Sequence, residues 1–155
     1  MKILAFIVSL LFLIRVEKPY NIYCNARFNY CINYPGFLIP QPESENGDGK
    51  VFKNKNGETI LTVFGTLNQD TNGDVMTLKM QFDLDIDVLV SAHSIISYKK
   101  IGKTYYVISG LKYGKIFYRK VLLKDESFCF ATLDYEQSER ETYDSLSVDI
   151  FKSFK

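Results

Sequence analysis

The stretch "IISYKKIGKTYYVISG", residues 95–110, decides the fold class, because it reads as two strands joined by a turn centred on Gly102. The stretches "KIFYRKVLL" (residues 115–123) and "FCFATLDY" (residues 128–135) repeat the pattern, with residues 124–127 as their turn. Strands joined by such short turns pair antiparallel. The second half of the chain is therefore predicted to form an antiparallel meander.

Further strands are predicted upstream of this meander. In "FNYCINY", residues 28–34, aromatic and aliphatic side chains alternate with polar ones up to Pro35-Gly36. A short strand around Val51 and Phe52 is joined to "TILTVFG", residues 59–65, through a turn that contains Asn56-Gly57. An Asn-Gly turn between two apolar runs predicts a hairpin.

The C-terminal residues have a different period. Ser138-x-x-Glu141 matches a capping box, which predicts the start of a helix. Apolar residues then recur at helical spacing at Tyr143, Leu146, Ile150 and Phe154. This helix is expected to lay one apolar stripe on the sheet.

Residues 77–92 give two conflicting signals. Apolar residues alternate strictly at Met76, Leu78, Met80, Phe82, Leu84, Ile86 and Val88, which favours a strand. A helical stripe also fits, at Leu78, Phe82, Ile86, Leu89 and His93, and the length is ordinary for a helix but long for a strand. Periodicity by itself favours the strand.

The first 26 residues have the outline of a signal peptide, with Lys2 before an apolar run at residues 3–14. That run is too short to span a membrane, which takes about 20 residues. Cys24-Asn25-Ala26 is the best match to a cleavage site, so a single domain is expected at residues 27–155, in the periplasm or secreted, without a stable membrane span. An uncleaved anchor and lipid attachment at Cys24 remain open alternatives.

Charge argues against a nucleic-acid partner. The predicted leader contains three of the 19 basic residues and one of the 18 acidic residues, which leaves 16 and 17 in the mature chain. Proteins that bind nucleic acids usually carry a basic surplus. We expect a near-neutral domain that does not bind nucleic acid.

Two cysteines, Cys31 and Cys129, would remain after cleavage. An even pair in an oxidising compartment predicts a disulfide between them. The alternative is two buried free thiols, because cysteine is often a small core residue.

Several pieces of the chain resemble a known family. They are Tyr34-Pro35, Asn46-Gly47-Asp48-Gly49 with Phe52, and Ser109-Gly110 followed by Phe117-Tyr118. From Ala26 onward the chain resembles small secreted bacterial proteins of uncharacterised function that are similar to the PsbP-like fold, an α/β/α sandwich. The resemblance implies an α+β fold, with an antiparallel sheet flanked by helices. It also implies a helix at residues 77–92, and it implies no catalytic residue and no cofactor.

Two acidic loops are candidate cation sites. Glu43, Glu45 and Asp48 in the first and Asp70 in the second offer the oxygen ligands that Ca²⁺ prefers. Their spacing does not match a twelve-residue calcium loop, and the glycines and asparagines around them are typical of turns. We interpret both loops as turns.

Other candidate sites are a histidine and three tyrosines. His93 is the only histidine, and a catalytic histidine needs an orienting partner that the sequence does not reveal. Tyr105, Tyr113 and Tyr118 lie in a tyrosine-rich segment that is a candidate partner surface, because aromatic residues are favoured in interface cores.

These observations predict an exported, non-enzymatic binding or accessory protein with an unknown protein partner. A narrower alternative is a periplasmic immunity or inhibitor protein that neutralises a secreted toxin. A third hypothesis is a hydrolase built on His93 or on a metal held by the acidic loops.

Overall fold

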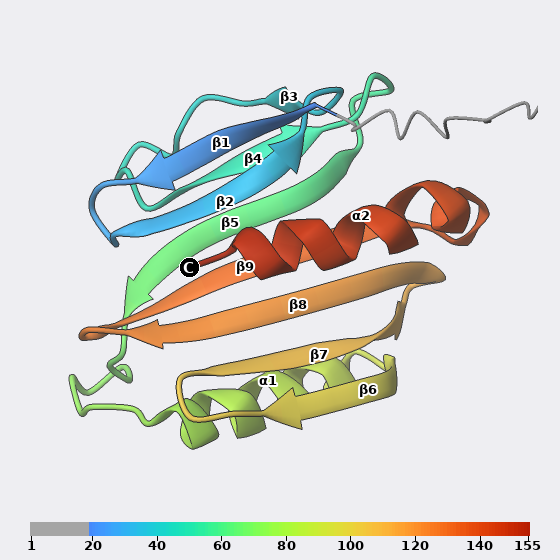
Figure 1. The fold of residues 1–155 in the computed structure, drawn as a ribbon. Coiled ribbons are helices and arrows are strands. Elements are labelled where there is room, and N and C mark those ends of the chain that lie inside the picture. Colours follow the sequence, from blue (N-terminus) through green and yellow to red (C-terminus); the bar gives the residue numbers. More distant parts are fainter. Residues whose placement is uncertain (1–18) are drawn as a thin grey trace, which may run out of the picture.

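The computed structural model of the protein describes residues 19–155. Nine strands and two α-helices follow one another along this part of the chain (Figure 1). The strands are β1 (Tyr20–Asn25), β2 (Tyr30–Pro35), β3 (Ile39–Pro40), β4 (Gly49–Lys53), β5 (Thr59–Leu67), β6 (Ile95–Ile101), β7 (Tyr105–Lys112), β8 (Lys115–Lys124) and β9 (Ser127–Glu136). The helices are α1 (Leu78–Ser91) and α2 (Arg140–Ser153), and a short 3₁₀ turn, Gln137–Glu139, precedes α2.

Seven strands form one antiparallel sheet in the order β3-β4-β5-β9-β8-β7-β6, and β1 and β2 form a separate hairpin. The predicted meander is confirmed, because β6, β7, β8 and β9 are consecutive neighbours. β6 bulges between Ile96 and Tyr98. A Cβ at Gly110 would lie 1.9 Å from the Ile95 carbonyl oxygen, so the two strands approach this closely only because residue 110 is glycine.

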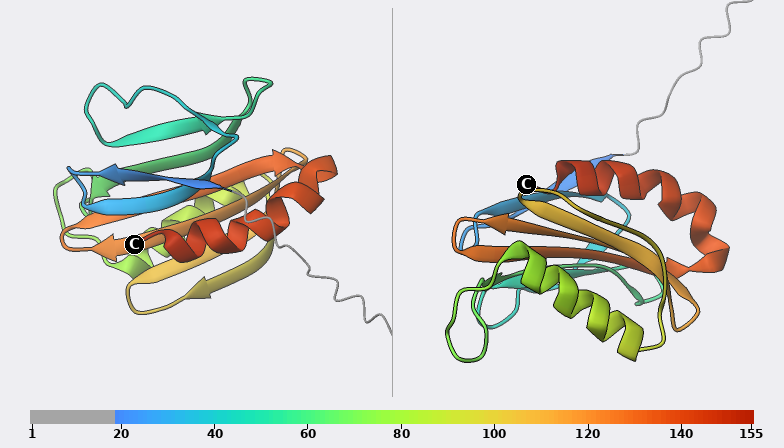
Figure 2. Two further views of the ribbon diagram at one scale, coloured as in Figure 1. Left: turned by 45° about the horizontal axis from the view of Figure 1, so that its top comes forward. Right: turned by 90° about the horizontal axis from the view of Figure 1, so that it is seen from below.

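The sheet is covered on both faces. Helix α1 lies on one face over β6 and β7, and α2 lies on the opposite face (Figure 2). The β1–β2 hairpin shares the α2 side, where Tyr23 packs edge-on against Phe52 of β4. The structure is therefore the α+β arrangement that the sequence predicts, with one core on each side of the sheet.

Helix α2 buries the predicted stripe. Tyr143, Leu146, Ile150 and Phe154 are all at most 3% exposed and pack into the core on this side. The predicted cap is wrong, because Ser138 lies inside the 3₁₀ turn and the α-helix begins at Arg140. Glu136 and Glu139 form the capping box instead, two residues upstream of the expected pair.

Helix α1 confirms the helix that the family resemblance implies at residues 77–92, against the alternation. Thr77 is its N-cap and accepts a hydrogen bond from the Met80 amide. Leu78, Asp85 and Leu89 are buried against the sheet. The apolar side chains of Met80, Leu84 and Val88 are exposed on the opposite side of the helix. A strand would bury every second side chain. A helix buries only the residues on the side that faces the sheet, here the apolar face of β6 and β7.

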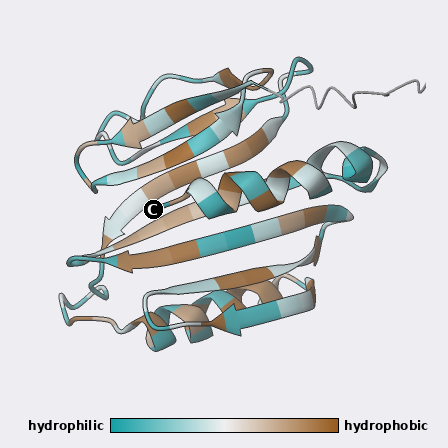
Figure 3. Ribbon diagram, in the orientation of Figure 1, coloured by the Kyte–Doolittle hydropathy of each residue, from teal (hydrophilic) through white to brown (hydrophobic). Residues whose placement is uncertain are grey.

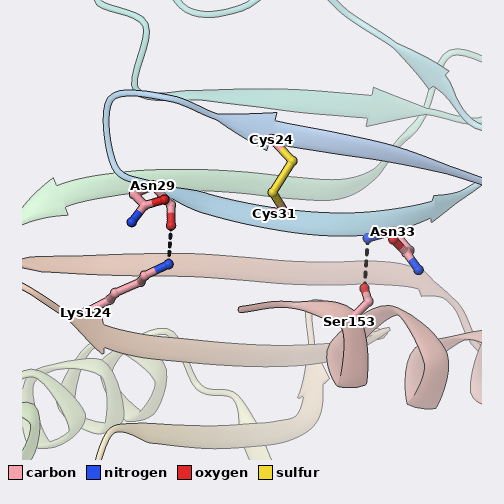
Figure 4. Close-up of a disulfide and its surroundings, with 6 residues drawn as sticks. All are labelled: Cys24, Asn29, Cys31, Asn33, Lys124 and Ser153. Atoms are coloured by element: carbon pink, nitrogen blue, oxygen red, sulfur yellow. Dashed lines mark hydrogen bonds between the residues drawn. A yellow bond between two sulfur atoms is a disulfide. The ribbon is translucent and has the colours of Figure 1, made fainter.

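The predicted disulfide between Cys31 and Cys129 is wrong. Cys31 is bonded to Cys24, directly opposite it in the β1–β2 hairpin, and Cys129 is a buried free thiol (Figure 4). Tyr30 and Ile32 point into the core, so the intervening Cys31 lies on the other face of β2, away from Cys129. Burial raises the pKa of the Cys129 thiol to about 11.

The hairpin is also held to the rest of the chain by hydrogen bonds. Lys124 Nζ donates to the Asn29 carbonyl, and the Asn33 amide donates to Ser153 Oγ of α2 over 2.8 Å (Figure 4). Residues 1–18 of the predicted leader lie outside the described residues, and the boundary after residue 26 stays a prediction. The strand β1 lies within that predicted leader, and its Tyr23 and Asn25 are buried.

Candidate functional site

The first acidic loop uses its carboxylates to hold its own turn. Asp48 accepts hydrogen bonds from Ser44 Oγ and, over 2.8 Å, from Asn46 Nδ2. Glu43 accepts from the Tyr23 hydroxyl over 2.7 Å, and Glu45 is exposed. The structure therefore separates the three carboxylates, and each of the two that are bonded has a structural partner.

Asp70 in the second loop also supports a turn. Its Oδ1 accepts from the backbone amides of Asn72 at 2.8 Å and Asp74 at 2.9 Å. This pattern is an Asx turn, in which a side chain replaces a backbone acceptor. Among residues 19–155, no group of three or more His, Cys, Asp or Glu side chains converges as metal ligands would.

An open groove of about 530 Å³ lies between the first acidic loop and strands β4 and β5. Its lining mixes loop residues with strand residues, namely Gln41, Pro42, Ser44, Asp48, Gly49, Lys50, Val51, Lys53, Thr59, Thr62, Val63 and Phe64. Asp48 is already bonded within the loop, and Phe64 stacks on Phe130 with ring centroids 4.6 Å apart. The other charged lining residues are Lys50 and Lys53, and Lys50 Nζ lies 5.0 Å from the centroid of the Tyr23 ring.

The three tyrosines do not form one surface. Tyr105 begins β7 and Tyr113 follows its end, so a whole strand separates them. Tyr113 is 80% exposed in the β7–β8 turn, whereas Tyr118 is partly buried beside Phe151 of α2. A shared aromatic patch therefore does not exist at these positions.

His93 terminates helix α1. It has a positive φ of 53°, immediately after the C-cap Ala92, and its amide donates to the Val90 carbonyl over 2.9 Å. This left-handed position usually ends a helix. The residue has a structural role here, and the side chain is exposed.

A buried polar network that the sequence pattern does not reveal joins α1 to the sheet. Asp85 is only 7% exposed and accepts from the Tyr106 hydroxyl at 2.6 Å. Arg119 of β8 lies 3.1 Å from the same carboxylate oxygen and also donates through Nε to Thr132 of β9. Burial, together with the Asp85 charge, raises the pKa of the Tyr106 hydroxyl. The only feature of the sequence that indicates this network is Asp85, which lies among the apolar residues of α1 that face the sheet.

Asp134, on β9, is a partly buried carboxyl group on the same side of the sheet. Burial raises its pKa although Arg119, Lys112 and Lys115 attract its charge. We expect Asp134→Asn to raise stability near neutral pH, where the folded state carries a poorly solvated carboxylate. The gain should vanish as the pH falls through the raised pKa toward the ordinary value of 3.8, because both states then hold the neutral acid.

Urea unfolding of wild type and Asp134→Asn at a series of pH values measures this difference. Glu141→Asn, at an exposed position of α2, is the control and should show no such pH-dependent gain. An Asp134→Asn advantage that is constant with pH would contradict the role of the charge.

Half of the large exposed apolar side chains belong to one helix and the strand beside it, where Ile101 projects to the α1 side of the sheet and Tyr98 to the opposite side. Seven of the fourteen large ones belong to α1 and the neighbouring strand β6, and we call this set the α1–β6 surface: Met80, Leu84, Val88, Val90, Ile95, Tyr98 and Ile101. Met80, Leu84 and Val88 recur every four residues and so form one outward stripe on the helix. Apolar clusters on a folded surface mark binding sites for other molecules.

The second feature of the α1–β6 surface is an open sheet edge. β6 is the last strand of the order and pairs only with β7 among the described strands (Figure 1). The opposite edge strand, β3, has only two residues and includes Pro40. β6 is therefore the longer of the two free edges, with backbone groups available for pairing.

No protein-family model and no curated protein matches this chain. Among solved structures, the chain is similar to the solution structure of cyanobacterial PsbP (CyanoP) from Synechocystis sp. PCC 6803. The TM-score is 0.61 at 14% sequence identity, over 90% of this chain and 93% of that one. The chain has the PsbP-like fold. At 14% sequence identity, this similarity establishes the fold only.

Proposed function

We propose that this chain is an exported, non-catalytic accessory protein that binds a protein partner through the α1–β6 surface. The observation that carries the proposal is the concentration of exposed apolar side chains on α1 and β6. Leu84, Val88 and Tyr98 are each about half exposed, at 49%, 52% and 51%, where water contact is unfavourable without a partner.

Export is supported by two features. The β1–β2 hairpin contains a disulfide, and disulfides persist mainly in oxidising compartments. The signal-like first residues agree with this location. Among residues 19–155, none of the helices has the length and apolar character needed to cross a membrane. No contact favours the immunity role over other protein-binding roles, so it stays a hypothesis from the sequence.

The test is affinity capture of the tagged, exported protein from its own cells, with mass spectrometry of bait and partner. We expect a stoichiometric partner with wild type and its loss with Leu84→Gln/Val88→Gln. Both positions are half exposed, so these substitutions should change stability by only about 0.5 kcal/mol.

Val148→Gln is the matched control, because Val148 is 66% exposed on α2, which covers the other face of the sheet. It should retain the partner. A partner that survives Leu84→Gln/Val88→Gln would contradict the proposed surface, and a bait that never retains any protein would contradict the binding function.

A further inference from the structure

Charge is strongly segregated along the chain, and the positive part contains the free edge of the sheet. Residues 88–124, which include β6, β7 and β8, contain eight lysines and arginines and no aspartate or glutamate. The other residues from 19 to 155 contain eight basic and 17 acidic side chains. The near-neutral total therefore conceals a basic half of the sheet.

Four of these eight cations are used internally. Lys115 pairs with Glu136 at 2.9 Å, and Arg119 pairs with Asp85. Lys120 donates to the Phe151 and Phe154 carbonyls, and Lys124 donates to the Asn29 carbonyl. They fasten α2, α1 and the hairpin to the sheet and are not free for a ligand.

Three lysines at the edge have no such role. Lys99 and Lys100 of β6 and Lys103 of the following turn are exposed, and none has a salt bridge or a side-chain hydrogen bond among the described residues. The two β6 lysines give the hydrophilic stretch near the arrowhead of that strand in Figure 3. Lysines without an internal partner therefore lie directly beside the free backbone groups of β6.

The lysines also determine which strands can pair there. Lys99 lies opposite Ile108, which belongs to the core under α1, and Lys100 lies opposite Val107, so the two side chains project to opposite faces. A second copy of β6, aligned antiparallel, would bring lysine against lysine, which is unfavourable. Lysines on an edge strand thus protect the protein from pairing with itself.

From this geometry we infer that β6 binds an extended acidic segment of a protein partner as an eighth strand of the sheet. Residues 98–101 are regular beyond the bulge and offer their outer backbone groups. Adjacent acidic residues in the incoming strand would reach Lys99 on one face and Lys100 on the other. Tyr98 and Ile101 would contact its apolar residues, as in strand addition to other sheet edges.

A lipid surface is the less favoured ligand for these lysines. The outer side of α1 carries Asp83 and Asp87, which an anionic membrane would repel, and lipid offers no partners for the backbone of β6. This inference rests on the proposed protein-binding function and names the chemistry of the bound segment.

The test uses a fluorescent peptide of about seven residues, with two central glutamates between valines and threonines, and measures its binding by anisotropy. We expect binding that weakens with salt and slows hydrogen exchange of the amides of residues 98–101. Lys99→Glu/Lys100→Glu should weaken it at least about tenfold. Lys55→Glu, an exposed lysine in the β4–β5 turn, is the control and should leave it unchanged.

Two further peptides and one vesicle complete the design. Replacing both central glutamates by lysines, or replacing by proline the one whose N–H would face β6, should abolish binding, because the first change reverses the charge and the second removes a backbone donor to β6. Peptide binding that Lys99→Glu/Lys100→Glu does not weaken would overturn the inference. Binding only to phosphatidylglycerol vesicles would also overturn it. Neither result changes what is expected from the affinity capture with Leu84→Gln/Val88→Gln. That experiment therefore tests the proposed function separately.

Discussion

A chain that begins at Arg27 is expected to be about 6 kcal/mol less stable to unfolding than one that begins at Pro19. The shorter chain lacks β1, whose Tyr23 is 8% exposed and is worth about 2 kcal/mol by burial alone. It also lacks the Asn25 side chain, which donates to the Gly47 carbonyl and accepts from the Phe28 amide. Hydrogen bonds of this kind contribute about 1 kcal/mol each.

The remainder comes from the disulfide, which closes a span of seven residues between Cys24 and Cys31. The chain-entropy model gives about 2.5 kcal/mol for a loop of this size. Cys24→Ser/Cys31→Ser in the chain from Pro19 isolates this part and should lose only about two fifths of the full effect. Guanidinium unfolding followed by circular dichroism measures all three proteins.

Equal stability of the two chains would show that β1 contributes nothing to the fold.

The experiment also bears on where the signal peptide is cleaved. If β1 stabilises the domain as expected, export with a cut after Ala26 would discard a folded strand and leave Cys31 unpaired. N-terminal sequencing of the exported protein decides between that boundary and one before Tyr20.

Arg119→Met is expected to destabilise the protein by about 3 kcal/mol. Removing the guanidinium leaves the Asp85 carboxylate largely buried and without its cation, which is the costly way to break such a pair. Because Asp85 belongs to α1 and Arg119 to β8, the loss should also loosen the helix from the sheet. Urea unfolding and hydrogen exchange of the α1 amides measure the two consequences.

The double variant Asp85→Leu/Arg119→Met tests the mechanism. It removes both charges, so most of the lost stability should return, although the Tyr106 hydroxyl then lacks its acceptor. Arg140→Met is the matched control, because the Arg140–Asp144 pair is exposed and should be worth less than about 1 kcal/mol. A double variant as unstable as Arg119→Met alone would contradict an uncompensated charge as the cause.

Much of the fold follows from local patterns. The strands of the meander and the stripe of α2 repeat with the periods of a strand and a helix, and each period is a property of a few consecutive residues. The turn role of the acidic loops follows from the same local chemistry, since Asp48 and Asp70 bond within four residues of themselves. The N-cap of α2 is Glu139, one residue after the predicted Ser138, because a 3₁₀ turn with its own capping box precedes the helix.

The candidate binding surface could be predicted only in part. A tyrosine-rich segment predicts a partner surface, but Tyr105 and Tyr113 lie at opposite ends of β7. The α1–β6 surface was not recognised because its apolar residues look the same in sequence as core residues. Leu84 and Leu89 differ only in which side of the helix faces the sheet, and they are 49% and 1% exposed.

The sequence by itself determined the antiparallel meander, its turns, the alternation of apolar and polar side chains along the strands, and the C-terminal helix. Each of these depends on residues within one hairpin or one helical turn. Local periodicity at residues 78–91 favours a strand, and tertiary structure overrode it because a helix there covers an apolar face of the sheet. Tertiary structure also decided that Cys31 pairs with Cys24 and that Asp85 meets Arg119. These outcomes depend on which faces of separate elements meet, and no local period records that.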